Sequence, residues 1–223
     1  FVEEGHNLNP EDSFYDVKKL AMETSSKRTY PDMISMKMME KLKPHTNSEY
    51  VAQNPNEKLE PITAMGCRSF LHRYYEKDEV GMWEEQVAGR SNAGVISVNL
   101  PRIGIEARGD KEYYFDLLEE RLLILKEGLM DREDRVLGAD KDEAPILYKY
   151  GALGPERETV ADYYNNKRAT ISIGYVGLHE SMVALFGKER WHQDKGSHDF
   201  SISVLEYIQE FIDRSQDDFQ CLL

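Results

Sequence analysis

The sequence is short of cysteine, of basic residues and of long apolar runs. Its 223 residues include two cysteines, Cys67 and Cys221, which rules out a disulfide framework and a four-thiolate metal site from this chain alone. No stretch approaches the roughly 20 consecutive apolar residues of a membrane-spanning helix, so no membrane partner is expected. Lysine and arginine number 28 against 41 aspartate and glutamate, a formal charge of −13. A polyanion repels the backbone of DNA and RNA, so nucleic acid is not an expected partner either.

The rest of the composition is that of a globular protein, with 40% hydrophobic and 31% charged residues. No secretory signal is visible at the N-terminus and cysteines are few, so we expect a cytoplasmic protein. The chain begins at Phe1 without a methionine and closes on an apolar tail after a helical pattern. We interpret it as part of a longer protein, and we expect the isolated chain to be inactive and poorly soluble.

Strand and helix patterns alternate in the second half of the chain. The strand patterns cover Gly94–Ala107 and Ala169–Leu178, and amphipathic helix patterns cover Asp110–Leu129 and His198–Phe219. The apolar stripe of the first helix consists of Tyr114, Leu118, Leu122, Leu125 and Leu129. Strands separated by long helices predict an α/β fold in which the strands are buried and parallel.

The first half of the chain has weaker patterns. Asp12–Leu42 is helical with an interruption at Pro31, which predicts two helices with a break after Tyr30. The polar stretch Pro44–Pro61 predicts a long loop. Ile62–Leu71 is predicted as a structured turn rather than a strand. Tyr74–Ala88 is predicted as a charged loop before the next element, and Asp131–Glu143 as a charged surface connection.

Cys67 follows Gly66, and glycine permits a sharp turn that can hold a thiol at the tip of a loop. Arg68 next to it would favour the reactive thiolate if its guanidinium lies close. The plainer interpretation is a small buried side chain, because free cysteine is among the most buried residue types. A metal site using Cys67 and His72 lacks its other ligands, so no metal ligand is predicted.

Two asparagines offer carboxamides on or beside the first predicted strand. Asn92 lies in the segment Gly89–Gly94, whose plain interpretation is a turn with Asn92 bonded to the nearby backbone. The functional interpretation places its carboxamide in a cleft, where it offers a donor and an acceptor to a polar substrate. Asn99, on the polar side of the strand, has the same two interpretations.

His179 and Glu180 directly follow the second predicted strand. Catalytic groups of parallel α/β proteins gather at the carboxyl ends of strands, which favours a functional interpretation. The plainer alternative is that Glu180 or Ser181 caps the next helix.

Four strings of the sequence resemble the catalytic subunit of the anaerobic, class III ribonucleotide reductases, which are glycyl-radical enzymes. The strings are Lys27–Ser35, Met65–Leu71, Gly89–Ile103 and Arg168–Glu180. Each one alone is weakly diagnostic, but all four follow the order of the family and together span most of the chain.

The resemblance implies that residues 1–223 are the central portion of a single catalytic domain, a ten-stranded α/β barrel with a central finger loop. Cys67 is similar to the finger-loop cysteine that carries a transient thiyl radical. Asn92 resembles the asparagine that contacts the ribose hydroxyls, and Asn99 is the alternative position for that role.

The activity implied by the resemblance is anaerobic reduction of ribonucleoside triphosphates to deoxyribonucleotides. A stored glycyl radical, generated by an activase that uses S-adenosylmethionine and an iron–sulfur cluster, converts the cysteine to a thiyl that abstracts the ribose 3′ hydrogen. The 2′ hydroxyl leaves as water, and formate or a thiol protein serves as reductant. A homodimer, a structural zinc and nucleotide effectors are implied for the full enzyme, with no cofactor bound by this segment.

Several segments expected of the family are missing from this sequence. The glycyl-radical segment, its zinc-binding cysteines, the regulatory region and the second active-site cysteine do not occur here. One alternative is a neighbouring glycyl-radical class, an acyltransferase or dehydratase, although the string Asn99–Arg102 and the single-cysteine finger argue against it. The other is an inactive truncated or split product that binds nucleotide or pairs with another chain.

Overall fold

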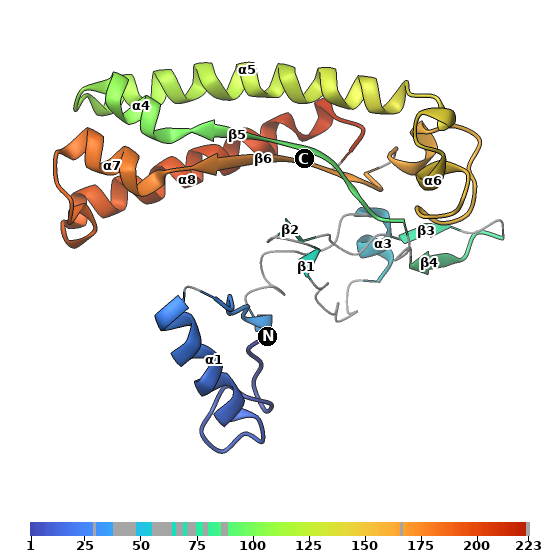
Figure 1. The fold of residues 1–223 in the computed structure, drawn as a ribbon. Helices are drawn as coiled ribbons and strands as arrows, with labels where there is room; N and C mark the ends of the chain where they lie inside the picture. The colour runs from blue at the N-terminus through green and yellow to red at the C-terminus, as the bar shows by residue number, and fades with distance from the viewer. Residues whose placement is uncertain are drawn as a thin grey trace. The chain divides into compact units, whose positions relative to one another are not determined.

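The computed structural model describes residues 1–28, 30–37, 48–54, 64–65, 69–70, 75–77, 80–85, 89–165 and 167–221. The chain divides into two units, Phe1–Val87 and Ala88–Leu223. Figure 1 shows the elements of both units in chain order. Among the described residues, no helix is long and apolar enough to cross a membrane.

The described residues of the first unit form two helices and two short antiparallel strand pairs. The helices are α1 (Tyr15–Arg28) and α3 (Ser48–Gln53), and the pairs are β1 (Ala64–Met65) with β2 (Ser69–Phe70) and β3 (Tyr75–Lys77) with β4 (Trp83–Glu85). The predicted break after Tyr30 is confirmed, since α1 ends at Arg28 and Tyr30 is not helical, while residues 38–42 of the second predicted helix lie outside the described residues. The segment Pro44–Pro61 was predicted to be a loop, but Ser48–Gln53 within it form α3. The segment Tyr74–Ala88 was predicted to be a charged loop, but it contains the antiparallel strands β3 and β4.

An aromatic cluster explains why these polar segments are ordered. The rings of Tyr50 and Tyr75 stack with centroids 3.8 Å apart, and Trp83 meets Tyr50 edge-on at 5.5 Å. The indole Nε1 of Trp83 donates to Gln53 Oε1 at 2.9 Å. Aromatic pairs of this geometry contribute about 0.5–1.5 kcal/mol beyond their buried area. Three rings therefore join α3 to β3 and β4, although the surrounding sequence is polar.

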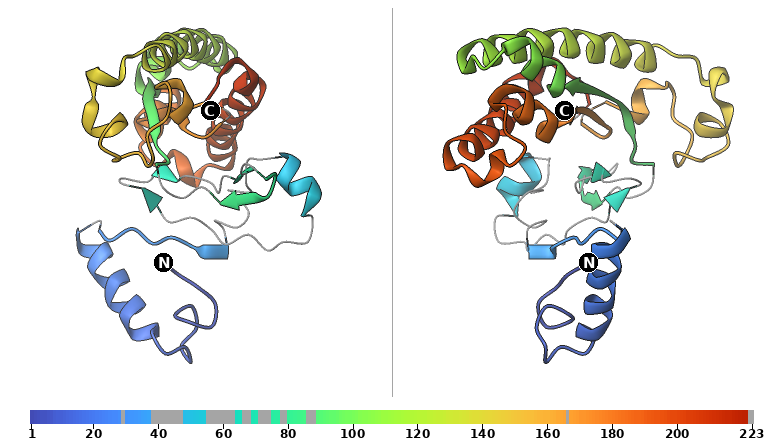
Figure 2. Two further views of the ribbon diagram at one scale, coloured as in Figure 1. Left: turned by 90° about the vertical axis from the view of Figure 1, so that its right-hand side faces the viewer. Right: turned by 60° about the vertical axis from the view of Figure 1, so that its left-hand side comes forward.

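The second unit is a mixed α/β structure around one parallel strand pair. Strand β5 (Asn92–Asn99) pairs with β6 (Thr170–Val176), and the pairing is parallel as predicted. The α-helices are α4 (Leu100–Ala107), α5 (Lys111–Leu137), α6 (Pro145–Tyr148), α7 (Leu178–Phe186) and α8 (Lys195–Ser215). Short 3₁₀ turns cover Lys141–Glu143, Ala161–Tyr163, Trp191–Gln193 and Gln216–Asp218. In Figures 1 and 2, α5 and α8 lie alongside the two strands.

Helix α4 replaces the second half of the predicted strand Gly94–Ala107. Asn99 caps it: its side-chain Oδ1 accepts a hydrogen bond from the Arg102 backbone N at 3.2 Å. Pro101 stands in the first turn, where a helix needs no donor from the backbone nitrogen. The buried residues of α4 are Leu100, Ile103, Gly104 and Ala107, which follow helical rather than strand spacing.

Helix α5 is longer than predicted. Asp110 caps it, with its carboxylate accepting from the backbone N of Glu112 and Tyr113 at 3.0 Å each. The predicted stripe is confirmed, since Tyr114, Leu118, Leu122, Leu125 and Leu129 are all buried. The helix continues to Leu137, so the predicted surface connection Asp131–Glu143 is wrong over its first half.

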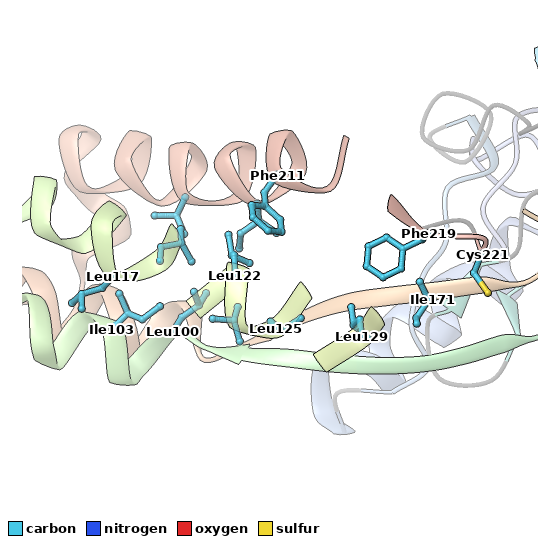
Figure 3. Packing of buried hydrophobic residues seen from close by; sticks show 14 of the residues in the cluster. Leu100, Ile103, Leu117, Leu122, Leu125, Leu129, Ile171, Phe211, Phe219 and Cys221 are labelled. Atoms are coloured by element: carbon cyan, nitrogen blue, oxygen red, sulfur yellow. The ribbon is translucent and has the colours of Figure 1, made fainter. Parts of the chain in front are cut away.

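The core of the second unit lies where α5 and α8 meet the strand pair. Figure 3 shows Leu122 of α5 near Phe211 of α8, while Leu129, Ile171 and Phe219 gather beside the strands. Burying a side chain of this size contributes about 1.5–3 kcal/mol. The two strands are only half buried, however, because Val95 is 54% and Tyr175 49% exposed. The prediction that both strands are buried is right only in part, since the buried residues of the pair are Val98, Thr170 and Ile171.

Helices α4 and α7 approach closely at Gly104. A Cβ added there would lie 2.5 Å from the backbone oxygen of Ser181. The Ser181 hydroxyl donates its one hydrogen to Leu100 O at 2.8 Å. Its contact with the Tyr114 hydroxyl, also 2.8 Å long, must therefore be a hydrogen bond that Tyr114 donates. Burial raises the pKa of Tyr114, which keeps this hydroxyl protonated as a donor.

We predict that Gly104→Ala lowers the free energy of unfolding by about 1–3 kcal/mol, because the added methyl group would force α4 and α7 apart. This loss would outweigh the gain in helix propensity, about 0.5–1 kcal/mol. Gly196→Ala in α8 is the matched control, since its nearest neighbour would be 3.8 Å away. Denaturant unfolding of both variants measures the difference, and equal stabilities would contradict the packing described for Gly104.

Candidate functional site

The strand pair has one face on α5 and one face turned away from it. A Cβ at Gly94 would lie 2.5 Å from the Arg132 side chain, and one at Gly128 would lie 3.2 Å from Ile96 Cδ1. Since Arg132 and Gly128 belong to α5, Gly94 and Ile96 face that helix. Side chains alternate along a strand, so the intervening residues face the other way. These are Val95, Ser97 and Asn99.

Strand β6 adds small and polar residues to the same side. In the parallel register Val95 pairs with Ser172, Ser97 with Gly174 and Asn99 with Val176. A Cβ at Gly174 would lie 2.5 Å from Ser97 Oγ, which places both on one face. A register shift between Asn92 and Gly94 brings the Asn92 side chain to this side as well. We call this surface the outer face, comprising Asn92, Val95, Ser97, Asn99, Ser172, Gly174 and Val176.

The carboxamide of Asn92 is held at both ends. Its Oδ1 accepts from the backbone N of Gly94 at 2.9 Å, and its Nδ2 donates to Ser172 Oγ at 2.8 Å. A backbone N–H can only donate, so the first contact fixes which end is the oxygen. The bond to Gly94 confirms the predicted bond of Asn92 to the nearby backbone, although both residues belong to β5 and not to a turn. A carboxamide has two N–H donors and two acceptor lone pairs, so among the hydrogen bonds described one donor and one acceptor remain. Asn92 can therefore bind a hydroxyl group while keeping its orientation.

Asn99 has a different role in the structure. It is exposed, and its Oδ1 caps α4 as described above. Strand β5 has eight residues from Asn92 to Asn99. At a rise of about 3.3 Å per residue the two asparagines are about 23 Å apart, too far for one ribose to contact both.

Cys67 lies outside the described residues. It belongs to the segment 66–68 between β1 and β2, where Ala64 pairs with Phe70 and Met65 with Ser69. The segment Ile62–Leu71 was predicted to be a turn rather than a strand. That prediction is wrong for Ala64–Met65 and Ser69–Phe70, which form short antiparallel strands.

His179 and Glu180 lie in the first turn of α7 at the carboxyl end of β6, and both are exposed. His179 Nδ1 accepts from the indole Nε1 of Trp191 at 3.1 Å. Gly177 begins the helix with φ of +75°, and no side chain caps it. The predicted cap from Glu180 or Ser181 is wrong, because Ser181 points into the core instead. Glu180 remains near the positive end of the helix.

A buried polar cluster at Cys221 was not predicted. The Glu133 carboxylate accepts from the backbone N of Cys221 at 2.6 Å and of Gln220 at 3.1 Å. Lys167 Nζ donates to the backbone oxygens of Gln216, at 2.9 Å, and Phe219. Glu133 stands four residues after Leu129, in line with the buried stripe of α5, and that spacing is the signal that locates it.

The thiol of Cys221 is structural rather than reactive. It is fully buried, and burial, followed by the hydrogen bond that the thiol donates to the Glu133 carboxylate, raises its pKa far above the ordinary value. The thiolate is the reactive form of cysteine, so a thiol held protonated is inert. Burial also lowers the pKa of Lys167, whose ammonium is stabilised by Asp217 and Glu133. Among the described residues, no group of three or more His, Cys, Asp or Glu could hold a metal ion.

We predict that Glu133→Ala exposes Cys221, because it leaves the buried backbone N–H of Cys221 unpaired at a cost of about 1–3 kcal/mol and also removes the acceptor of the partly buried Gln220 N–H. The measurement is the rate at which Cys221 reacts with a thiol reagent, in a Cys67→Ser background so that one cysteine reports. We expect the rate to rise about tenfold or more. Glu127→Ala, an exposed acid on the same helix, is the control and should leave the rate unchanged. An unchanged rate in Glu133→Ala would show that Glu133 does not hold the segment.

Comparisons with known proteins agree on one family. Residues 1–222 match the family described as anaerobic ribonucleoside-triphosphate reductase. Proteins of that name from Escherichia coli and Salmonella typhimurium are 37% and 38% identical over 225 residues, covering 97% of this chain and 28% of theirs. The one from phage T4 is 38% identical over 197 residues, covering 85% of this chain and 29% of its own. The chain thus spans less than a third of the length of these relatives.

Proposed function

Since the chain belongs to the anaerobic ribonucleoside-triphosphate reductase family, we propose that the complete protein reduces ribonucleoside triphosphates to deoxyribonucleotides. The observation that carries the proposal is the family match over residues 1–222. It confirms the resemblance drawn from the four strings. The reaction is an oxidoreduction, and the protein is proposed to act in the cytoplasm under anaerobic conditions.

We propose that residues 1–223 form the central portion of one catalytic domain, a ten-stranded α/β barrel with Cys67 in its finger loop. The parallel pairing of β5 and β6, with helices α4 and α5 between them in sequence, supports two adjacent barrel strands. Within the described residues each strand pairs only with the other, so each has an edge for a further strand. The outer face, which is the side of the strand pair turned away from α5, would then face the interior of the barrel.

Cys67 is proposed to carry out the hydrogen-atom transfer. In such enzymes a glycyl radical, generated by a radical S-adenosylmethionine activase, would take the hydrogen atom of the cysteine thiol, so that the S–H bond breaks, a glycine C–H bond forms and a thiyl radical remains. The sulfur of Cys67 takes the hydrogen atom from ribose C3′, forming an S–H bond as the C3′–H bond breaks. The 2′ hydroxyl then leaves as water, and formate or a thiol protein supplies the reducing electrons.

Asn92 is proposed to bind the ribose hydroxyls. Its free donor and acceptor suit a hydroxyl group, which is itself a donor and an acceptor. A neutral carboxamide orients hydroxyls without removing a proton from them. Its two structural hydrogen bonds mean that little conformational freedom is lost on binding.

Further partners belong to the same proposal. They are an activating enzyme, nucleotide effectors, a structural zinc and a second copy of the subunit in a homodimer.

We predict that Cys67→Ser in the complete protein abolishes deoxynucleotide formation, because an alcohol O–H bond is too strong for reversible hydrogen-atom transfer. Asn92→Ala should lower kcat/KM about two- to tenfold for each hydrogen bond lost, as expected for bonds of about 0.5–1.5 kcal/mol. Product is measured under anaerobic conditions after activation, with the glycyl radical quantified by EPR. We expect the radical in both variants.

Cys221→Ala serves as the cysteine control and should retain turnover, since its thiol is inert. Turnover by Cys67→Ser would remove Cys67 from the mechanism. If the unmodified, activated protein forms no deoxynucleotide from any ribonucleoside triphosphate, the proposed function itself fails.

We predict that Asn99→Ser keeps activity near that of the unmodified protein. Serine caps helices about as well as asparagine, so α4 is retained while the carboxamide is removed. Asn99→Ala should instead cost about 1 kcal/mol of stability through the lost cap. Steady-state turnover and thermal unfolding of the two variants test this. Loss of activity in Asn99→Ser with full activity in Asn92→Ala would assign the ribose contact to Asn99.

A further inference from the structure

We propose that Ser172 is a positioning residue for the substrate, acting through Asn92. Its hydroxyl holds the Asn92 carboxamide in the orientation that recognises a ribose hydroxyl. The inference rests on the proposed function and adds to it a residue that does not touch the reacting atoms.

The geometry of Asn92 shows why a second anchor matters. The last side-chain torsion of asparagine is broad, so one hydrogen bond leaves the amide plane able to rotate. The backbone N of Gly94 holds Oδ1 at 2.9 Å, and Ser172 Oγ holds Nδ2 at 2.8 Å. Two contacts on opposite ends of the carboxamide fix its plane. They also fix the directions of the remaining N–H and lone pair.

Ser172 reaches Asn92 because of the strand register. It pairs with Val95, and the register shift between Asn92 and Gly94 turns Asn92 toward it. The two residues are 80 positions apart in sequence, so the contact exists only when β5 and β6 pair correctly. Serine is not among the residues enriched in strands, so its presence in β6 is not explained by strand propensity. The hydrogen bond to Asn92 supplies a reason for it.

The experiment uses the complete, activated protein with Ser172→Ala, Ser172→Thr and the control Ser203→Ala. Ser203 is a partly buried serine of α8 whose hydroxyl bonds locally to Phe200 O. The measurements are KM and kcat for a ribonucleoside triphosphate and the glycyl-radical content by EPR. A third is the inhibition constant of a 2′,3′-dideoxynucleoside triphosphate, which lacks both ribose hydroxyls.

For Ser172→Ala we expect KM for the ribonucleotide to rise about three- to tenfold, as expected from one weakened hydrogen bond. Radical content and the inhibition constant of the dideoxy analogue should not change, because that analogue has no hydroxyl for Asn92 to bind. Ser172→Thr keeps the hydroxyl and should restore KM to within about twofold of the unmodified protein. Ser203→Ala should match the unmodified protein throughout.

Three results would overturn the inference. An unchanged KM in Ser172→Ala would show that the hydroxyl does not position Asn92. Equal weakening of the ribonucleotide and the dideoxy analogue would indicate a general structural role. Failure of Ser172→Thr to restore KM would show that the hydroxyl is not the group that matters. Each of these leaves the proposed function standing, which fails only if the unmodified protein makes no deoxynucleotide.

Discussion

The parallel pairing of β5 and β6 is the interaction on which the second unit depends. Its backbone hydrogen bonds join segments about 80 residues apart, and α5 covers one side of the pair with its leucine stripe. Each strand runs directly into a helix, α4 after β5 and α7 after β6, and these helices meet at Gly104. The register of the strands therefore sets the helix contact at one end. It also sets the composition of the outer face.

The outer face offers neutral polar groups to a substrate. Its polar groups near the start of β5 are a carboxamide and a hydroxyl, Asn92 and Ser172, which are neutral at physiological pH. Such groups orient a substrate hydroxyl without ionising it. The cysteine that the structure describes, Cys221, is buried and protonated, which leaves Cys67 as the thiol proposed for chemistry. The proposed radical reaction also needs a site closed to water, and the interior of the proposed barrel would provide one.

Periodicity predicted the parts of the fold in which local pattern and tertiary structure agree. The stripe of α5 and the β-branched run of β5 are examples, and the parallel pairing followed from their alternation. Helix α4 was missed because Ile103 and Ile105 extend a strand-like pattern, and the decisive signal was the capping position of Asn99. Glu133 was missed because its neighbours are charged. Asn92 was singled out from its carboxamide beside the strand and given its ribose role by resemblance, but its contact with Ser172 depends on a register that no local pattern contains.

The outer face of the β5–β6 pair is proposed to bind the ribose, with Asn92 as the contact residue and Ser172 as the residue that positions it. The most direct test is an experimental structure of the complete protein with a bound ribonucleoside triphosphate. We expect a ribose hydroxyl within about 2.5–3.2 Å of the Asn92 carboxamide, on the face away from α5, with the Asn92–Ser172 hydrogen bond retained. A ribose bound elsewhere, with Asn92 bonded only to Gly94 and Ser172, would contradict it.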